Sequence, residues 1–223
     1  MPVSCFGKSC TVVMPLNSAR VKIDAVREYG AVVNLIDVHA KSRAECVAEL
    51  EKEHPEAFIA SAYDDPLIIE GNASLGQEIC ALNREFDFVV VPIGGGGLSS
   101  GIITGIRRFG KEIDVVGAEP LMANDAAQSL RHGYIVRHDS EPQTIADGAR
   151  TVSLGEHNWT ILRTGLSGIV EVPEDQIKEG LRVLFSLANL KVEPTGALSI
   201  GALLTELRSS AASEFVVSSL VEM

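Results

Sequence analysis

Residues 89–101, VVVPIGGGGLSSG, join a β-branched run directly to four consecutive glycines. A backbone without Cβ atoms can adopt positive φ angles and close around an anion. In open α/β sheets such a turn lies at the carboxyl end of a strand, where unpaired N–H groups meet the positive end of a helix dipole. The stretch therefore predicts a buried strand, a phosphate-binding turn and a helix from Leu98; a tight turn without a ligand is the alternative.

Strands and helices are predicted to alternate along the rest of the chain. The expected strands are 10–15, 31–38, 87–93, 113–119, 168–172 and 214–221. The expected helices are 18–30, 42–54, about 70–83, one from Leu98, about 122–132, 173–189 and one after Thr195. This alternation predicts an α/β fold with open, mostly parallel sheets and helices on both faces.

Apolar residues at helical spacing predict which side of three helices is buried. The first two helices have the sets Val21, Ala25, Val26 and Ala44, Val47, Ala48, Leu50. The helix 173–189 has the set Ile177, Leu181, Leu184 and Ala188.

Charge and cysteine content narrow the class of protein. The formal charge of -11 and the pI near 4.9 argue against binding to nucleic acid or to anionic membranes, which need a cationic surface. No apolar run reaches the roughly eighteen residues of a membrane span. The four cysteines have no CxxC pair and no His-rich neighbour, which predicts neither a zinc site nor a disulfide framework. We expect reduced thiols in a cytoplasmic protein.

Spacing separates the possible phosphate sites. A Walker A loop has lysine and Ser/Thr after its last glycine, whereas Leu98 follows Gly97. A dinucleotide fingerprint, G-x-G-x-x-G with an acidic residue about twenty positions on, is met loosely by Gly96 to Gly101 with Glu119. The residues alone favour a phosphorylated cofactor, with a dinucleotide-binding oxidoreductase domain as the alternative.

Five motifs occur in an order and spacing that resemble one known family: YDDP, VVPIGGGGLSSG, VVGAEP, TIADGAR and EPTGA. From about Thr11 to Leu207 the chain resembles the pyridoxal-phosphate (PLP) enzymes of the threonine dehydratase and serine racemase family, which are fold type II proteins similar to tryptophan synthase β. The resemblance implies a two-lobed α/β fold. Residues 1–63 would be part of the small domain, and residues 64–223 a large cofactor-binding domain that lacks its N-terminal segment.

The resemblance assigns two groups of site residues. In that family the cofactor phosphate is held by the residues that match Gly94, Gly95, Gly96, Gly97 and the Leu98 amide. Glu193 matches the acidic residue beside the cofactor ring; a carboxylate at a helix start near Thr195 is the alternative. A divalent-cation site for Mg²⁺ or Ca²⁺ matches Glu119, the Ala123 carbonyl and Asp125, although the residues alone would be read as solvated surface carboxylates.

The chain also departs from the family pattern. The Ser-x-Lys segment that supplies the Schiff-base lysine and the Ser-Gly-Asn-His-type loop would lie before residue 10 and are not found, so no catalytic residue is assigned. Lys8 is expected to be an exposed N-terminal lysine. The family's GQGT-like stretch is GNAS at 71–74, and the final Ser-Gly-Gly-Asn turn is missing, with Ser218 or Ser219 near its place. We therefore expect a chain shortened at both ends.

The expected function is that of a threonine/serine dehydratase-like protein, an ammonia-lyase or racemase for β-hydroxy amino acids such as threonine or serine, impaired or inactive as this chain. The first alternative is a non-catalytic paralogue that binds a phosphate-bearing ligand or a partner chain. The second alternative is a dinucleotide-binding domain. Open edges of a parallel sheet expose unpaired backbone groups, which predicts a homo-oligomer or poor solubility.

Overall fold

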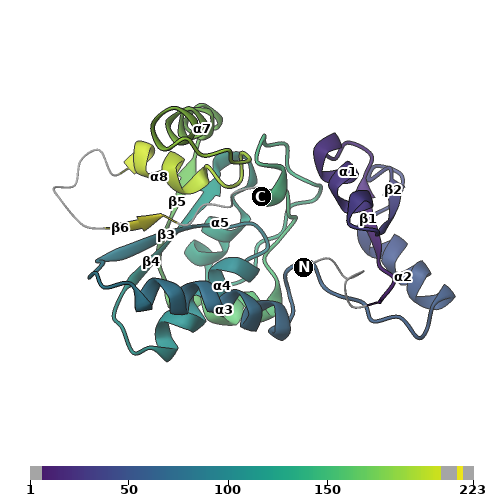
Figure 1. The fold of residues 1–223 in the computed structure, drawn as a ribbon, viewed down its shortest axis with the longest axis horizontal. Helices are drawn as coiled ribbons and strands as arrows, with labels where there is room; N and C mark the ends of the chain where they lie inside the picture. The colour runs from purple at the N-terminus through teal and green to yellow at the C-terminus, as the bar shows by residue number, and fades with distance from the viewer. Residues whose placement is uncertain (1–6, 207–214, 218–223) are drawn as a thin grey trace. The chain divides into compact units, whose positions relative to one another are not determined.

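Figure 1 shows the computed structural model of the chain, which describes residues 7–206 and 215–217. The expected Ser218 and Ser219 positions lie outside the described residues. The chain divides into two compact units, residues 1–60 and residues 61–223, called unit 1 and unit 2 below.

Unit 1 is a two-stranded parallel sheet with two helices. Its elements in chain order are β1 (Thr11–Pro15), α1 (Arg20–Glu28), β2 (Val32–Ile36) and α2 (Arg43–Glu53). Strand β1 pairs with β2 in a register that places Thr11 opposite Val32. Helix α2 begins with a capping box, in which the Ser42 hydroxyl accepts the Glu45 N–H and the Glu45 carboxylate accepts the Ser42 N–H at 2.8 Å.

The predicted buried sides of the two helices in unit 1 are only partly right, because Ala25, Val26, Val47 and Leu50 are half-buried while the other three predicted residues are exposed. The buried residue of α1 is Ile23 and that of α2 is Cys46. Val21 is 55% exposed, and Ala44 and Ala48 are exposed as well. A two-stranded sheet covers only a narrow strip of each helix, so apolar spacing identifies the helix without fixing which residues reach the sheet.

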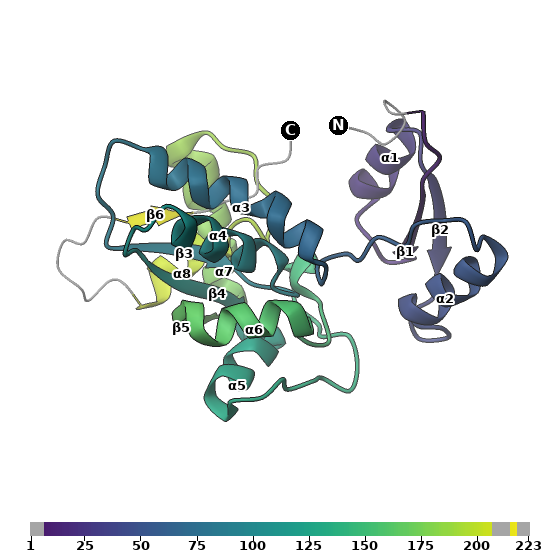
Figure 2. The same ribbon diagram turned by 90° about the horizontal axis from the view of Figure 1, so that it is seen from below.

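Unit 2 is built on a four-stranded parallel sheet of order β5-β4-β3-β6. Its strands are β3 (Phe88–Pro92), β4 (Asp114–Pro120), β5 (Leu166–Val172) and β6 (Phe215–Val217). Its helices are α3 (Pro66–Ala81), α4 (Gly97–Arg108), α5 (Asp125–His132), α6 (Glu156–Gly165), α7 (Glu174–Ala188) and α8 (Leu198–Glu206). Figures 1 and 2 show α7 and α8 on one face of the sheet and α3, α4 and α6 on the other. This confirms the expected fold class.

Strand β3 separates two hydrophobic cores. Val89 and Val91 pack into the core beneath α3, α4 and α6, while Val90 packs into the core with α7 and α8. Successive strand residues point to opposite faces, so a strand covered by helices on both faces must be apolar throughout. This is why the β-branched run before the glycines has no alternating polar residues.

Two helices of unit 2 differ from expectation. Helix α3 begins at Pro66 rather than near residue 70, because the Asp65 carboxylate caps it by accepting the Leu67 N–H at 2.7 Å and Pro66 occupies its first turn. The sequence reading placed no helix where α6 lies. In helix 173–189, Ile177 and Leu184 are buried as predicted, whereas Ala188 is exposed.

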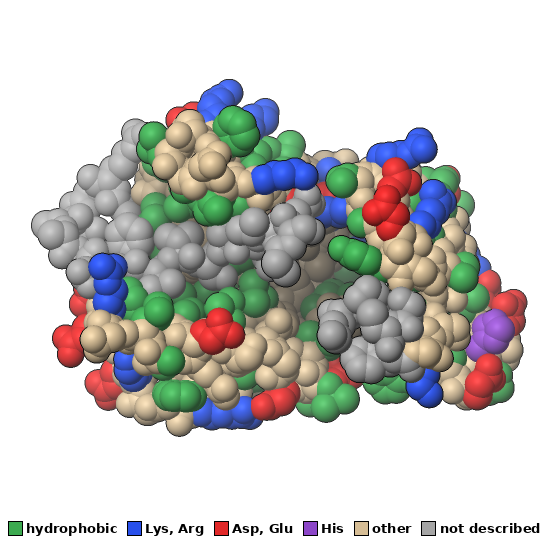
Figure 3. Space-filling view, viewed as in Figure 1, with side chains coloured by type: hydrophobic (Ala, Val, Ile, Leu, Met, Phe, Trp, Pro, Cys, Tyr) green, Lys and Arg blue, Asp and Glu red, His purple; other side chains and the backbone are tan. Residues whose placement is uncertain are grey.

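The surface of unit 2 mixes charges of both signs. On the face seen in Figure 3, acidic and basic side chains are interspersed, and the described residues there form no continuous cationic patch. Within residues 7–206 and 215–217, no helix combines the length and the apolar character required to cross a membrane.

Helices α3 and α4 approach closely enough to exclude side chains from the contact. A Cβ on Gly105 would overlap the Ala73 carbonyl oxygen and lie 2.9 Å from the Gly76 Cα. A Cβ on Gly76 would likewise overlap the Ile102 carbonyl oxygen. Because these neighbours are backbone atoms, only a shift of a whole helix could make room.

The close contact between α3 and α4 predicts that a Gly→Ala substitution changes the free energy of unfolding in opposite directions inside and outside the contact. We expect Gly105→Ala to lower the free energy of unfolding by roughly 1–3 kcal/mol through overpacking. Gly71→Ala, at an exposed position of α3 with nothing within 4 Å of its Cβ, should raise it by roughly 0.5–1 kcal/mol through helix propensity. Urea unfolding of both variants checks this. Equal effects at the two positions would contradict the backbone contact.

Candidate functional site

The four glycines form the turn between β3 and α4. The ladder ends where the Ile93 N–H donates to the Ala118 carbonyl at 2.9 Å, and Gly96, at φ +97°, is the N-cap of α4. Among the hydrogen bonds of the described residues, none is donated by the backbone N–H groups from Gly94 to Ser99. These donors lie at the positive end of the α4 dipole, which makes the turn a suitable place for an anion.

Protein packing explains why three of these residues lack a side chain. A Cβ on Gly95 would overlap the Tyr63 ring, and one on Gly97 would lie 2.8 Å from the Tyr63 carbonyl oxygen. A Cβ on Gly96 would lie 2.8 Å from Leu162. Packing alone would account for a tight turn without a ligand, but it gives no reason for leaving the row of N–H groups without acceptors.

Asn158 holds this arrangement together from α6. Its Nδ2 donates to the Tyr63 carbonyl at 3.0 Å and to the Gly95 carbonyl at 2.9 Å, and the residue is fully buried. Sequence reasoning missed Asn158 because it missed α6. The available signal was the helical spacing of Trp159 and Leu162 after Gly155.

Three residues of the YDDP motif at 63–66 contact three different elements, namely the glycine turn, α3 and α6. Tyr63 packs on the glycine turn, and Asp65 caps α3. Asp64 caps α6 from outside the helix, because its carboxylate accepts the N–H groups of Glu156 at 2.9 Å and His157 at 3.0 Å. Gly155, the N-cap of α6, has no side chain of its own to do this, and a Cβ there would overlap the Asp64 carboxylate.

The TIADGAR and EPTGA motifs meet beside the turn. The Gly148 N–H donates to the Thr195 hydroxyl at 3.0 Å. A Cβ on Gly94 would in turn lie 3.0 Å from the Gly148 carbonyl oxygen. Glu193 is half-buried, two residues before Thr195, and its carbonyl accepts the Ala197 N–H at 3.2 Å. The structure thus brings the segment of Glu193 to the edge of the glycine turn.

The two carboxylates predicted as cation ligands lie at the carboxyl end of β4. Glu119 and Asp125 are each 1% exposed, so the reading as solvated surface residues is wrong. The oxygens of Glu119 accept the N–H groups of Ala126 at 2.8 Å and Ala127 at 2.9 Å, at the start of α5. Burial and the neighbouring Asp125 raise the pKa of Glu119 well above its usual value.

Asp125 has unused coordination capacity. Burial raises its pKa from 3.8 to about 7, and its Oδ2 has no hydrogen-bond partner among the described residues. The Ala123 carbonyl, in the 3-10 turn Leu121–Ala123, accepts no hydrogen bond from the described part of the chain. Nor do any three His, Cys, Asp or Glu side chains of that part converge as a metal site. A cation here would need carbonyl or water ligands as well, which Mg²⁺ and Ca²⁺ accept.

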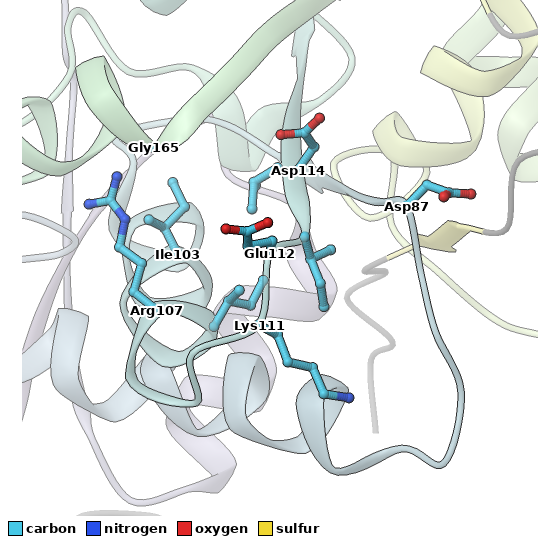
Figure 4. A pocket seen from close by; sticks show the side chains of 10 residues that line it. Asp87, Ile103, Arg107, Lys111, Glu112, Asp114 and Gly165 are labelled. Carbon is cyan, nitrogen blue, oxygen red and sulfur yellow. The ribbon is translucent and has the colours of Figure 1, made fainter.

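A separate pocket of about 490 Å³ opens at the other end of the sheet (Figure 4). Its lining includes Asp87, Asp114 and Gly165, which lie at or just before the starts of β3, β4 and β5. Arg107 reaches across and donates to the Thr164 carbonyl at 2.8 Å. Ligands of open α/β sheets bind at the carboxyl ends of the strands, so we assign the site to the glycine turn and not to this pocket.

Comparisons with known proteins agree with this assignment of fold and cofactor class. A family model described as pyridoxal-phosphate dependent enzyme matches residues 4–220. L-threo-3-hydroxyaspartate ammonia-lyase from Pseudomonas sp is 35% identical over 193 residues, which are 86% of this chain and 60% of that protein. Serine racemase from Schizosaccharomyces pombe is 33% identical over 196 residues, covering 88% of this chain and 60% of that protein.

Solved structures of similar proteins show the same fold. A threonine deaminase from T.th. superposes with a TM-score of 0.86 at 34% identity, covering 99% of this chain and 71% of that one. Maize serine racemase superposes with a TM-score of 0.90 at 27% identity, covering 99% and 68%. The chain spans about 60% of the length of the curated relatives that it matches.

The buried Asp125 predicts a pH-dependent stability for the ion-free protein. Because its folded pKa, about 7, lies above its ordinary value of 3.8, its stabilising contribution is complete below about pH 4 and is lost as the pH rises to 7. Asp125→Asn removes this titration. We expect the unfolding free energy of wild type relative to the variant to fall by at most about 4 kcal/mol between pH 4 and 7 in chelator. Parallel pH profiles would contradict the raised pKa.

Proposed function

This chain belongs to the family of pyridoxal-phosphate dependent enzymes, and on that premise we propose that Gly94 to Gly97 and the Leu98 amide hold the phosphate of PLP. The observation that carries the proposal is the row of backbone N–H groups at the start of α4, in buried and half-buried residues, that find no acceptor among the described residues. Tyr63 and Asn158 fix the shape of this row before any ligand arrives. A preformed cradle of this kind binds phosphate without reorganising.

The remaining parts of the site follow from the same placement. We propose that residues 64–223 form the cofactor-binding domain and residues 1–63 belong to the smaller domain. Glu193 is proposed to lie beside the cofactor ring, because Thr195 and Gly148 join its segment to the glycine turn. These residues would orient the ring while the glycine N–H groups hold its phosphate.

For the whole protein we propose elimination or racemisation of a small β-hydroxy amino acid such as threonine or serine. The similar proteins are an ammonia-lyase of L-threo-3-hydroxyaspartate, serine racemases and a threonine deaminase. When bound, PLP withdraws electrons from the α-carbon of an amino acid, so that its proton can leave. This chain's part is to anchor and orient the cofactor; the described residues supply no assigned proton acceptor.

Lysine exposure favours a second candidate function, the binding of a phosphate-bearing ligand without a covalent bond. The described lysines of unit 2, Lys111, Lys178 and Lys191, are all exposed. In unit 1, Lys8 and Lys52 are exposed, whereas Lys22 and Lys41 are half-buried. A lysine that reacts with a cofactor carbonyl must be uncharged, and desolvation in a closed site is one way to achieve this.

Association and location are further proposals. Strand β5 is one of the two outer strands of the unit 2 sheet, and such an edge carries unpaired backbone groups, which favours a homo-oligomer. The described cysteines, Cys10, Cys46 and Cys80, are free thiols, in keeping with a reducing compartment such as the cytoplasm.

The phosphate cradle predicts that binding depends on the phosphate group. Titration with PLP, followed by fluorescence of the single tryptophan, Trp159, should show binding that inorganic phosphate competes away. Pyridoxal should bind at least roughly tenfold more weakly, about 1.4 kcal/mol. Leu98→Pro, which removes one donor in the first turn of α4, should weaken PLP to a similar degree. Asp175→Pro, at the same position of α7, should leave binding unchanged.

The same titration separates the alternatives. Equal binding of PLP and pyridoxal without phosphate competition would overturn the cradle even if Leu98→Pro fails to fold. Preferential binding of NAD would favour a dinucleotide site. Borohydride reduction followed by peptide mass spectrometry should find no modified lysine; attachment to a single lysine would instead overturn the second candidate function.

We also propose that Glu119, the Ala123 carbonyl and Asp125 bind Mg²⁺ or Ca²⁺, because the burial of both carboxylates leaves Asp125 Oδ2 without a partner. An ion at about a hundred times its Kd adds about 2.7 kcal/mol, or roughly 5–10 °C in Tm for a chain of this size. We expect this shift in differential scanning fluorimetry. Asp125→Asn should abolish it, whereas Asp139→Asn, at an exposed position, should keep it. An equal shift in both variants would reject the site.

A further inference from the structure

The pocket of about 490 Å³ at the amino ends of the strands is separate from the proposed cofactor site (Figure 4). Its volume lies in the range of roughly 300–1,000 Å³ that is usual for small-molecule sites. Its floor is apolar, because Ile103, Ile106 and Val115 belong to the core beneath α3, α4 and α6, and Ile113 packs against that core. The floor therefore suits the aliphatic part of a ligand.

Arg107 gives this pocket a cationic side that is held in place by the protein. From the last turn of α4, its Nη2 donates to the Thr164 carbonyl at 2.8 Å, and a Cβ on Gly165 would lie 3.2 Å from the same nitrogen. Among the hydrogen bonds of the described residues, none is donated by Nη1 or Nε of Arg107. Because the guanidinium is planar, fixing one nitrogen gives the remaining donors a defined direction toward a carboxylate.

Two carboxylates give the pocket an anionic side. Glu112 and Asp114 line it from the segment that leads into β4, and both residues are exposed. Within the part of the chain that the structure describes, neither carboxylate accepts a hydrogen bond or pairs with Arg107. Figure 4 shows Arg107 and Glu112 on either side of Ile103, whereas Asp87 and Lys111 point away from it.

We propose that this pocket binds an aliphatic α-amino acid as an intact zwitterion. Its carboxylate would accept hydrogen bonds from Arg107, its ammonium group would lie between Glu112 and Asp114, and its side chain would cover the apolar floor. An inorganic anion on Arg107 would meet two carboxylates of its own sign, and an aliphatic amine would leave the guanidinium donors without an acceptor. A ligand that carries both charges on an aliphatic body matches all three sides of the pocket. The inference does not depend on the proposed cofactor site, because the glycine turn lies at the opposite edge of the sheet.

Saturation-transfer nuclear magnetic resonance on the full chain tests this with L-leucine and two analogues. We expect leucine to bind with a Kd of roughly 1 mM or below, as suits a ligand of this size. Isocaproate lacks only the ammonium group, and isoamylamine lacks only the carboxylate. Each should bind at least roughly fivefold more weakly than leucine, because each loses one set of charged hydrogen bonds.

Variants of the charged residues locate the binding. The double variant Glu112→Gln, Asp114→Asn should weaken leucine at least roughly fivefold without weakening isocaproate, because only the ammonium group loses its partners. Arg107→Gln should weaken leucine to a similar degree without weakening isoamylamine. Glu85→Gln and Arg163→Gln change exposed charges outside the pocket lining, so these matched controls should leave leucine binding unchanged.

Three results would overturn the proposal. Wild type that does not bind leucine would reject the site, and leucine binding that every variant retains would place the ligand elsewhere on the chain. Equal binding of leucine, isocaproate and isoamylamine would show that the charged sides recognise nothing. If Arg107→Gln does not fold, the comparison of leucine with isoamylamine on wild type decides the role of the guanidinium.

Discussion

The carboxamide of Asn158 connects the three segments from which the glycine turn is built. From α6 it donates to Tyr63, which precedes α3, and to Gly95, which follows β3. Both acceptors are backbone carbonyls, and Asn158 itself is fully buried, where an unpaired polar group costs about 1–3 kcal/mol. A single buried side chain therefore fixes the distance between α3, β3 and α6. These two hydrogen bonds hold the backbone of the turn in one conformation, and this fixes the direction of its N–H groups.

The direction of the strands decides where chemistry can occur in unit 2. All four strands are parallel, so the ends of β3 and β4 place the glycine turn and Glu119 at the same edge of the sheet. At the opposite edge, the pocket near Lys111 mixes acidic and basic side chains, and its arginine, Arg107, is already hydrogen-bonded to Thr164. The proposed anion and cation sites share one edge because each parallel strand delivers a turn and a helix start to that edge.

The features that could be predicted from the sequence are those determined by residues close together along the chain. The glycine turn, the parallel sheet and the Asp65 cap of α3 rest on local patterns, and of these the turn and the sheet were predicted. Contacts between distant segments could not be predicted this way. Asp64 caps a helix that begins more than ninety residues later. Nothing in the sequence around Asp64 or around Glu156 indicates that the two residues are in contact. The same holds for Asn158, whose partners are determined only once the sheet has formed.

The two buried carboxylates at the end of β4 show how tertiary structure reverses a reading based on local sequence. Two carboxylates six residues apart at the end of a strand are ordinarily solvated, and nothing near Glu119 or Asp125 in the sequence suggests otherwise. The 3-10 turn Leu121–Ala123 folds the start of α5 back onto β4, so that Glu119 accepts two N–H groups of that helix and Asp125 follows it into the interior. Burial and the neighbouring Asp125 raise the pKa of Glu119, and burial raises the pKa of Asp125, which is the cost of placing both carboxylates in the interior. The stability of the β4–α5 connection therefore depends on how this burial is compensated, for Glu119 by the two N–H groups of α5 and for Asp125, in our proposal, by a bound cation.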